Sequence, residues 1–334
     1  MIRLFRGLRH SGVLGMNERN ADYIMLYNLR RNYPFVDDKL ITKQRAERAG
    51  IRVPQLYATV EIERQIRKLP RLLAEHDDFV IKPAHGSGGN GILVVAESRN
   101  DNYRLASGRL VGIDHISHHI SNILSGMHSL GGQPDQAVIE QRVIFDPLFE
   151  RISHGGVPDI RTIVFRGVPV MAMVRLPTRG SDGKANLHQG AVGAGLDMAT
   201  GRTTTAVWMD RFTDIHPDTG DPIAGVQIPE WNDLLELSAR CHALADLGYL
   251  GVDIVLDRNH GPMVLELNAR PGLSIQLANR RPLQPRLQRI EAMETVPVDP
   301  ARRAAMAREL FGEEEPPPVQ EVGGSGVATA EPVP

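Results

Sequence analysis

The sequence predicts an α+β protein of 334 residues. Two antiparallel hairpins favour this class: one closes through Arg166-Gly167, and the other closes through the turn Arg258-Asn-His-Gly261. A helical stretch over residues 233–248 repeats leucine and alanine at spacings of three and four. Hydrophobic residues make up 42% of the chain and charged residues 23%. A chain of this length and composition can bury a large core and form two or more subdomains.

In the first half of the chain, predicted helices and strands alternate. The predicted helices cover residues 20–31, 39–50, 62–76 and 115–124, and the predicted strands cover residues 79–82, 92–96 and 137–143. Gly50 ends the second of these helices in the manner of a C-terminal cap. The insert over residues 97–136 is harder to interpret beyond its one helix.

In the second half, strands 159–165 and 168–176 form the first hairpin. The Gly-rich, polar stretch 178–195 is predicted to be a mobile or ligand-ordered loop, and residues 208–229 look irregular. The helix and the second hairpin follow. From about Gly312 the chain is rich in Glu, Pro and Gly, which predicts a disordered tail over 312–334.

Composition excludes several classes of protein. The formal net charge of −2 gives no drive toward nucleic acid or membranes, and an aromatic content of 5% argues against stacking on single strands. No apolar run reaches the length of a membrane span. Residues 1–9 are basic but lack a signal-peptide core, so we expect a solvated arm, with weak surface association as the alternative.

The single cysteine, Cys241, rules out an intrachain disulfide and fits a reducing, cytoplasmic location. Cys241 lies in the helical stretch over 233–248 beside several leucines. We therefore expect a buried core thiol and not a nucleophile, even though His242 is its neighbour, because adjacent helical side chains point apart.

The second hairpin carries three oxygen ligands. If the turn closes between Asp257 and Pro262, Asp253 lies opposite Glu266, and Asn268 follows on the same face. Two carboxylates and an amide oxygen on one rigid face suit a hard cation such as Mg²⁺. The alternative is an ordinary solvent-facing row of polar residues, and a register slip of one residue would separate the ligands.

A glycine loop follows the predicted strand that ends at Lys82. Four glycines lie within residues 86–91, so backbone N–H groups can wrap a polyanion, and Lys82 can place its ammonium group on the same phosphates. The loop matches neither a Walker A motif nor a dinucleotide fingerprint. A tight β-turn without a ligand is the alternative.

The order of the motifs resembles the ATP-grasp superfamily, and within it the ribosomal-protein alpha-L-glutamate ligases and their alpha-L-glutamate ligase-like relatives. The matching stretches, which span roughly residues 37–290, are Asp38-Lys39, residues 79–95, residues 137–143, Asp159-Ile-Arg161, residues 184–190, Gly251-Val-Asp253 and residues 265–272. The resemblance implies two α+β subdomains that clamp ATP: residues 37–136 with the glycine loop, and residues 137–293 with the metal site. A short basic segment, residues 1–36, would precede them as a truncated N-terminal region.

The resemblance also implies roles for individual residues. ATP would be held by Lys39, Lys82, Gly86, Ser87, Gly88, Gly89, Gly91, Glu140, Gln141, Val143, Asp159, Lys184 and Asn186. Within this set the 140–143 segment would contact adenine through its backbone, and Asp159 would approach the ribose. Asp253, Glu266 and Asn268 would ligate Mg²⁺, with Mn²⁺ as an alternative. Arg161 and Arg175 would stabilise the transferred phosphoryl group, and His188 would either accept a proton or form a structural hydrogen bond.

The implied reaction is a carboxylate–amine ligation through an acylphosphate, which adds glutamate or another amino acid to a peptide or protein acceptor. Lys184 stands where the glutamate ligases carry Arg, so ATP binding is implied more strongly than glutamate specificity. Two alternatives stay open: a kinase or phosphotransferase with the same triphosphate site, and a non-catalytic nucleotide-binding module. Four histidines, His115, His118, His119 and His128, invite a zinc site, but a solvated helix face fits their spacing better.

Overall fold

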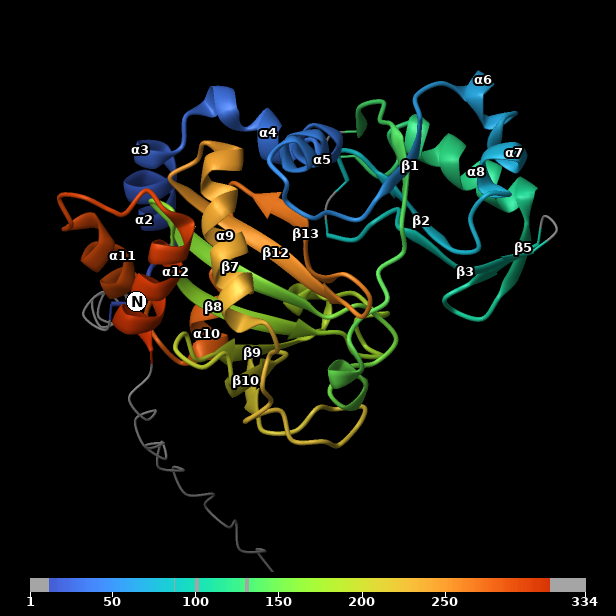
Figure 1. Cartoon of the computed structure of the whole chain (residues 1–334). Helices are drawn as coiled ribbons and strands as arrows, with labels where there is room; N and C mark the ends of the chain where they lie inside the picture. The colour runs from blue at the N-terminus through green and yellow to red at the C-terminus, as the bar shows by residue number, and fades with distance from the viewer. Residues whose placement is uncertain (1–11, 87, 100–101, 130–131, 313–334) are drawn as a thin grey trace, which may run out of the picture.

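The computed structural model describes residues 12–86, 88–99, 102–129 and 132–312. Within these residues the strands form two antiparallel sheets, one in each of two lobes (Figure 1). The first sheet has the order β1-β6-β2-β3-β4-β5, and the second has the order β11-β10-β9-β8-β7-β12-β13. The predicted α+β class is confirmed.

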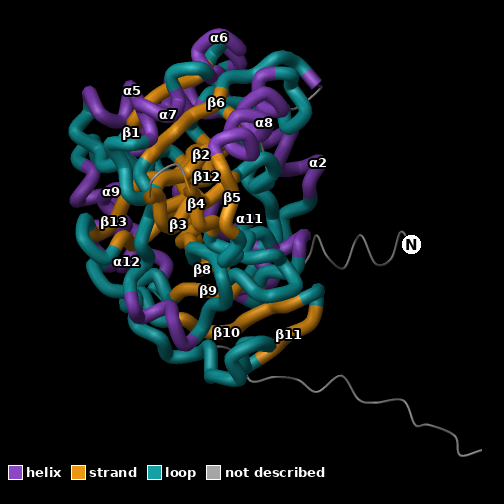
Figure 2. Tube along the Cα trace, turned by 90° about the vertical axis from the view of Figure 1, so that its right-hand side faces the viewer, coloured by secondary structure: helices purple, strands orange, loops and turns teal. Residues whose placement is uncertain are grey.

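The first sheet contains β1 (Leu56–Val60), β2 (Phe79–Pro83), β3 (Leu93–Arg99), β4 (Asn102–Leu105), β5 (Leu110–Gly112) and β6 (Ala137–Glu140). The second contains β7 (Asp159–Phe165), β8 (Val168–Leu176), β9 (Val192–Leu196), β10 (Thr203–Trp208), β11 (Arg211–Thr213), β12 (Tyr249–Asp257) and β13 (Gly261–Asn268). The short β11 forms one edge of this sheet (Figure 2).

The helices of the N-terminal half are α2 (Met16–Glu18), a π-helical turn (Arg19–Ile24), α3 (Met25–Tyr27), a 3₁₀ turn (Arg30–Asn32), α4 (Pro34–Asp37), α5 (Lys39–Arg48), α6 (Glu63–Ile66), α7 (Leu69–Leu73) and α8 (Ile113–Leu124). Later come 3₁₀ turns at Pro147–Arg151 and Leu187–Gln189, then α9 (Trp231–Ala245), α10 (Ile275–Asn279), α11 (Gln284–Glu291) and α12 (Pro300–Phe311). The helix predicted over 62–76 is wrong as one element. It breaks into α6 and α7, because Pro70 favours the first turn of a new helix.

The first lobe has its own core beneath α8. Ile116, Ile120 and Ile123 recur at helical spacing and are fully buried against the sheet with Phe79 and Tyr103. The 97–136 insert thus completes this lobe, because its strands β4 and β5 extend the sheet and its helix covers it.

The second lobe is built around β7 and β12. The hydroxyl of Thr162 on β7 donates to Ser238 on α9 at 3.0 Å, so α9 covers this face of the sheet. Side chains alternate along β7, and Asp159 and Arg161 therefore point to the opposite face. The predicted hairpin through Arg166-Gly167 is confirmed, and both turn residues have positive φ, at 50° and 84°.

Residues 12–36 pack against the second lobe. Arg19 is buried and donates to the backbone oxygen of Pro271 at 2.7 Å, and the ring of Tyr23 meets that of Phe165 edge-on at 5.5 Å. The predicted solvated arm over 1–9 and the tail over 313–334 lie outside the described residues. Among the residues that are described, no helix is long and apolar enough to cross a membrane.

Cys241 is fully buried in the core of the second lobe, as predicted. Burial raises the pKa of its thiol to about 12, which keeps it protonated near neutral pH. This thiol is therefore a core side chain and not a nucleophile.

Candidate active site

The metal-ligand hairpin pairs Asp253 with Glu266, as the sequence predicts, but by a different route. The turn closes at Asp257 and Gly261, one residue earlier than expected. A bulge beside Asp253 adds one residue to β13 and restores the pairing. Gly251 then lies opposite Asn268, so Asn268 follows Glu266 on the same face.

β12 does not alternate between a buried and an exposed face. All nine residues of β12 are buried, including Asp253 at 2% exposure, because the strand lies between β7 and β13 inside the sheet. A buried carboxylate requires partners, and the neighbouring strand provides them.

Two arginines hold the two buried carboxylates of the sheet. Arg161 lies opposite Asp253 and donates to both of its oxygens, with distances of 2.5 Å from Nε and Nη2. Arg175 lies opposite Asp159, contacts both of its oxygens at 2.6 and 2.5 Å, and also reaches Asp253 at 2.8 Å. These two arginines, the two aspartates and Glu266 lie side by side on one face of β8, β7, β12 and β13, and we call this set the charged row.

The two buried carboxyl groups of the charged row, those of Asp159 and Asp253, have different pKa values. Burial raises the pKa of Asp159 to about 6, despite Arg175, and the charge of Asp253 adds to the shift. Burial acts on Asp253 too, but Arg161 and Arg175 outweigh it and lower its pKa. Asp253 receives hydrogen bonds from both arginines and Asp159 from one, so Asp253 is the group that stays ionised.

Facing the second lobe, three buried charges form an ion triad: Lys43, Lys82 and Glu140. One carboxylate oxygen of Glu140 contacts Lys82, and the other lies 2.8 Å from Lys43. Burial would raise the pKa of Glu140, but Lys82 and Lys43 outweigh it and lower the pKa. Sequence reasoning missed Lys43, although it lies one helical turn after Lys39 on α5.

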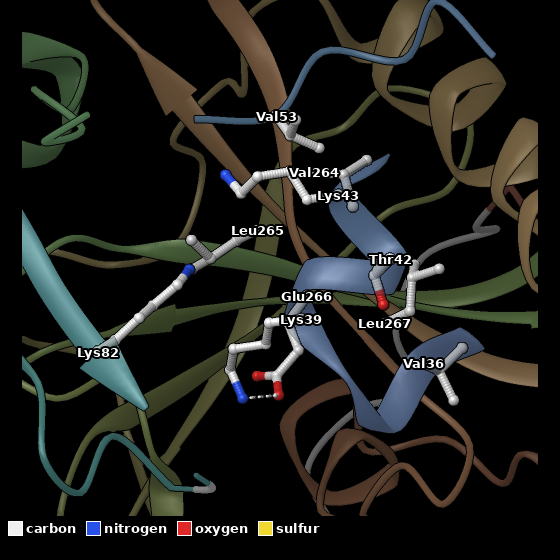
Figure 3. Close-up of a pocket in the computed structure, with 10 residues that line it drawn as sticks. All are labelled: Val36, Lys39, Thr42, Lys43, Val53, Lys82, Val264, Leu265, Glu266 and Leu267. Atoms are coloured by element: carbon white, nitrogen blue, oxygen red, sulfur yellow. Dashed lines mark ion pairs between the residues drawn. The ribbon is translucent and has the colours of Figure 1, made fainter. Parts of the chain in front are cut away.

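A pocket joins the two lobes at this point. Its lining combines lysines of α5 and β2 with residues of β13: Val36, Lys39, Thr42, Lys43, Val53, Lys82, Val264, Leu265, Glu266 and Leu267. Figure 3 shows Lys82 extending from β2 and Lys39 beside Glu266. Nζ of Lys39 lies 3.5 Å from a carboxylate oxygen of Glu266. The structure thus brings both predicted phosphate lysines and one predicted metal ligand to the same pocket.

The glycine loop lies beneath the loop after β8. Gln189 donates to the backbone oxygen of Gly88 at 3.1 Å, and a Cβ on Gly89 would lie 3.5 Å from Lys184. Asn186 accepts from the backbone N–H of His188, which is exposed. The 178–191 segment is therefore placed as a cover over the glycine loop. Ser87 lies outside the described residues.

The base of the glycine loop is tied to α5. His85 contacts Asp135 at 2.8 Å through Nδ1 and Asp38 at 3.4 Å through Nε2, and Asp38 caps α5. Lys39 donates to the backbone oxygen of Gly86 at 2.6 Å. Asp135 was not predicted from the sequence, because nothing local marks a residue 50 positions away as a partner of His85.

The segment after β6 connects the two lobes. The N–H of Gln141 donates to Gln55, and the N–H of Ile144 donates to Asp257 at 2.9 Å. Between them, the backbone N–H groups of Arg142 and Val143 have no partner among the described residues. The side chain of Glu140 is held by the ion triad, and Oε1 of Gln141 accepts a hydrogen bond from the backbone N–H of Gln55.

The hairpin carries oxygen donors of the kind that Mg²⁺ prefers, but both oxygens of Asp253 accept hydrogen bonds from Arg161 or Arg175. Asp253, Glu266 and Asn268 offer only carboxylate and amide oxygens from neighbouring positions. Glu266 is more accessible than Asp253, with 37% of its side chain exposed. No group of three or more His, Cys, Asp or Glu suited to a metal occurs in the described part of the chain, which leaves the zinc idea without support.

The histidines are only partly a solvated face. His118 is exposed, but His119 bonds the backbone oxygen of Gly91 at 3.0 Å, and its ring lies 5.8 Å from that of His128. A Cβ on Gly91 would lie 2.6 Å from the His128 ring. These two histidines therefore support the end of the glycine loop.

Comparison with known proteins gives similar sequences and folds. A probable alpha-L-glutamate ligase from Maridesulfovibrio salexigens is 31% identical over 124 residues, which cover 37% of this chain and 30% of that protein. The chain thus matches less than a third of the length of this relative. Similar solved structures include a RimK domain ATP-grasp protein from Sphaerobacter thermophilus (TM-score 0.45, 13% identity, covering 78% of this chain and 69% of that one). Another is the D-alanine–D-alanine ligase from Bacillus anthracis in complex with ATP (TM-score 0.41, 14% identity, covering 84% and 66%).

The profile of one family, the sugar-transfer associated ATP-grasp proteins, matches residues 18–292. That range contains both sheets, the glycine loop, the ion triad and the charged row. The match covers most of the chain, and the chain therefore belongs to the sugar-transfer associated ATP-grasp family.

Proposed function

We propose that this protein is an ATP- and Mg²⁺-dependent ligase that joins a carboxylate to an amine. The observation that carries the proposal is the pocket between the lobes, where Lys39 and Lys82 face Glu266 below the glycine loop. Family membership supports the use of ATP. Cations on one wall and oxygen donors on the other suit a triphosphate bound with its metal ion.

The proposed reaction has two steps. A carboxylate oxygen attacks the γ-phosphorus, the bond from that phosphorus to ADP breaks, and an acylphosphate forms. The amine nitrogen then attacks the acyl carbon, the bond to phosphate breaks, and the nitrogen loses a proton. The protein need not supply a nucleophile, since its task is to align the carboxylate and to neutralise charge.

Each group of residues in the site has a separate proposed role in binding ATP. Lys39 and Lys82 bind the α- and β-phosphates, with the glycine loop closed over them. The free backbone N–H groups of Arg142 and Val143, in the segment after β6, donate hydrogen bonds to adenine. Lys184 and Asn186 reach the triphosphate from the covering segment, which also excludes water from the acylphosphate.

The charged row supports the transferred group. Arg161 and Arg175 lie on the face that points toward the pocket, and they place two permanent positive charges where the phosphoryl group carries negative charge. Asp253, Glu266 and Asn268 are the proposed Mg²⁺ ligands, and the ion would neutralise phosphate charge there. Asp159 is held by Arg175, so its predicted approach to the ribose stays a prediction.

For the substrates, we propose an amino acid such as glutamate and an amine acceptor on a peptide or protein. The relative from Maridesulfovibrio salexigens is a probable alpha-L-glutamate ligase, which supports glutamate as the first amino acid to test. The family is described as sugar-transfer associated, so an amino sugar is a second kind of amine to test. Cytoplasmic location stays a prediction.

The experiment measures ADP and phosphate release from ATP and Mg²⁺. Amino acids are supplied as the carboxylate, and peptides, amino sugars and hydroxyl compounds as acceptors. Release that needs both a carboxylate and an amine, with an amide product in the mass spectrum, is the expected result. Release driven by a hydroxyl compound, with a phosphorylated product, would identify a kinase instead. Nucleotide binding without release under every condition would favour a non-catalytic module.

A further inference from the structure

A second pocket lies on the far side of α5 from the phosphate lysines. It is formed where α5 packs against α9, and its lining combines three arginines with small or apolar residues: Arg45, Arg48, Ala49, Ile51, Arg240, Ala243, Leu244 and Pro300. No acidic residue is among them. The two pockets share no lining residue, although Lys43 of the first and Arg45 of the second are only two positions apart on α5.

Two of these arginines stabilise the ends of the two helices. Arg45 of α5 donates through Nε to the backbone oxygen of Leu244 near the end of α9, at 2.9 Å. Arg240 of α9 donates through one Nη2 to the backbone oxygens of Ala49 and Gly50 after α5, at 2.8 and 3.1 Å. Carbonyl capping therefore uses part of each guanidinium group and leaves further N–H donors.

Capping does not explain the whole cluster. Arg48 is exposed, and its side chain makes no hydrogen bond or ion pair with another residue in the described ranges. Neither Arg45 nor Arg240 is paired with a carboxylate in the same ranges. Glu47 is the nearest acidic residue in sequence, but it does not line this pocket. Its charge instead favours the protonated form of Lys43. Three positive charges thus share one pocket without a negative partner.

We infer that this pocket is an anion site for a phosphate or phosphate monoester, separate from the nucleotide site. Guanidinium groups match phosphate oxygens in pairs, and three of them suit a dianion. The apolar wall of Ile51, Leu244 and Pro300 offers contact to an organic group on the phosphate. The inference does not rest on the proposed ligase activity, since it uses none of the residues of that site.

The test is calorimetric titration of the full chain with inorganic phosphate and, separately, with phenyl phosphate at low ionic strength. We expect one equivalent to bind and Arg48→Glu to weaken binding at least tenfold. Arg64→Glu, the same change at an exposed arginine of α6, should leave it unaltered. Tighter binding of phenyl phosphate assigns the site to an organic phosphate, and equal binding assigns it to free phosphate.

Three results would overturn the inference. The first is the absence of saturable binding by the folded wild-type chain. The second is an equal loss of phosphate affinity in Arg48→Glu and Arg64→Glu, which would indicate a general effect of the protein's net charge. The third is a loss of phosphate binding in Lys39→Met while Arg48→Glu binds phosphate as the wild type does, which would place the anion in the nucleotide pocket. Thermal unfolding of each variant confirms its fold, and Arg48 is chosen because it caps no carbonyl.

Discussion

At the scale of single residues, the charged row explains how carboxylates can lie inside a sheet. Asp253 is buried on a central strand, and it stays ionised because two guanidinium groups donate to it. Removing one member of such a buried set leaves a charge without a partner, which costs about 3–5 kcal/mol. Glu266, in contrast, is partly exposed, and its one ion pair among the described residues is with Lys39.

Asp253 and Glu266 should therefore respond differently to loss of charge. Glu266→Gln is expected to change the free energy of unfolding by less than about 0.5 kcal/mol, as for a surface position. Its ligase turnover should fall on the order of 100-fold, because a proposed Mg²⁺ ligand loses its charge. Asp253→Asn should lose turnover and also several kcal/mol of stability. Urea unfolding and ADP release measure the two effects, and full turnover in Glu266→Gln would remove it from the metal site.

The ion triad predicts how stability depends on pH. The folded pKa of Glu140 lies below its ordinary value of 4.5, so the unfolded chain takes up the proton first as the pH falls. The stabilisation by Glu140 is therefore complete above pH 4.5 and is lost as the pH falls through the folded pKa. The charge-free variant Glu140→Gln should be less stable at pH 7 but show a shallower decline between pH 5 and 3. Equal slopes in both proteins would contradict this assignment.

At the scale of elements, the glycine loop depends on its surroundings as much as on its glycines. Gly91 has a φ of +77°, its backbone oxygen is bonded by His119, and the His128 ring occupies the space a side chain would need. The insert that carries α8 therefore shapes the loop. The glycines of the loop allow its backbone many conformations, and the packing of α8 and the residues after it determines which conformation the loop adopts.

Gly91→Ala should weaken nucleotide binding several-fold. Positive φ alone costs about 1–2 kcal/mol for alanine, and the added Cβ would lie 2.6 Å from His128, which forces the loop to shift. Gly108→Ala is the matched control, because Gly108 has a φ of +85° with nothing within 4 Å of its Cβ position. Titration with an ATP analogue measures affinity. Equal affinity in the two variants would show that the loop position does not matter for binding.

At the scale of the whole molecule, a charged contact joins the two lobes at the pocket between them. Lys39 lies at this junction, since it bonds the glycine loop at Gly86 and approaches Glu266 of the second lobe. A ligand that occupies the pocket between the lobes contacts both of them, so its binding should stabilise the entire fold.

A non-hydrolysable ATP analogue with Mg²⁺ should raise the melting temperature. At a ligand concentration 100 times the Kd, mass action adds about 2.7 kcal/mol of stability. Lys39→Met should reduce this shift at the same ligand concentration by removing a phosphate contact. Lys68→Met, the same change at an exposed lysine of the first lobe, should keep the full shift. An unchanged shift in Lys39→Met would remove this lysine from the nucleotide site.

The sequence by itself determined the α+β class, the strands of both hairpins, strands β2, β3 and β6, and helices α5, α8 and α9, because alternating side chains, helical spacing and turn residues are local properties. It placed Asp253 opposite Glu266 by assuming that the turn closes at Asp257 and Pro262, whereas it closes at Asp257 and Gly261. It missed strands β4, β5 and β11 and helices α10, α11 and α12, as well as β9 and β10, whose glycines and threonines lack a clear apolar alternation. It also missed the bulge in β13, because the register depends on the neighbouring strands.

Only the tertiary structure decided which charges meet. Lys82 and Glu140 are 58 residues apart, Arg161 and Asp253 are 92 apart, and in each case adjacent strands of one sheet bring them together. Burial favours ion pairs between these residues, because a buried charge is strongly destabilising unless an opposite charge lies beside it. Residue types and spacing identify the candidates for a phosphate site, but sheet order and burial determine which of them bind each other and which face the pocket.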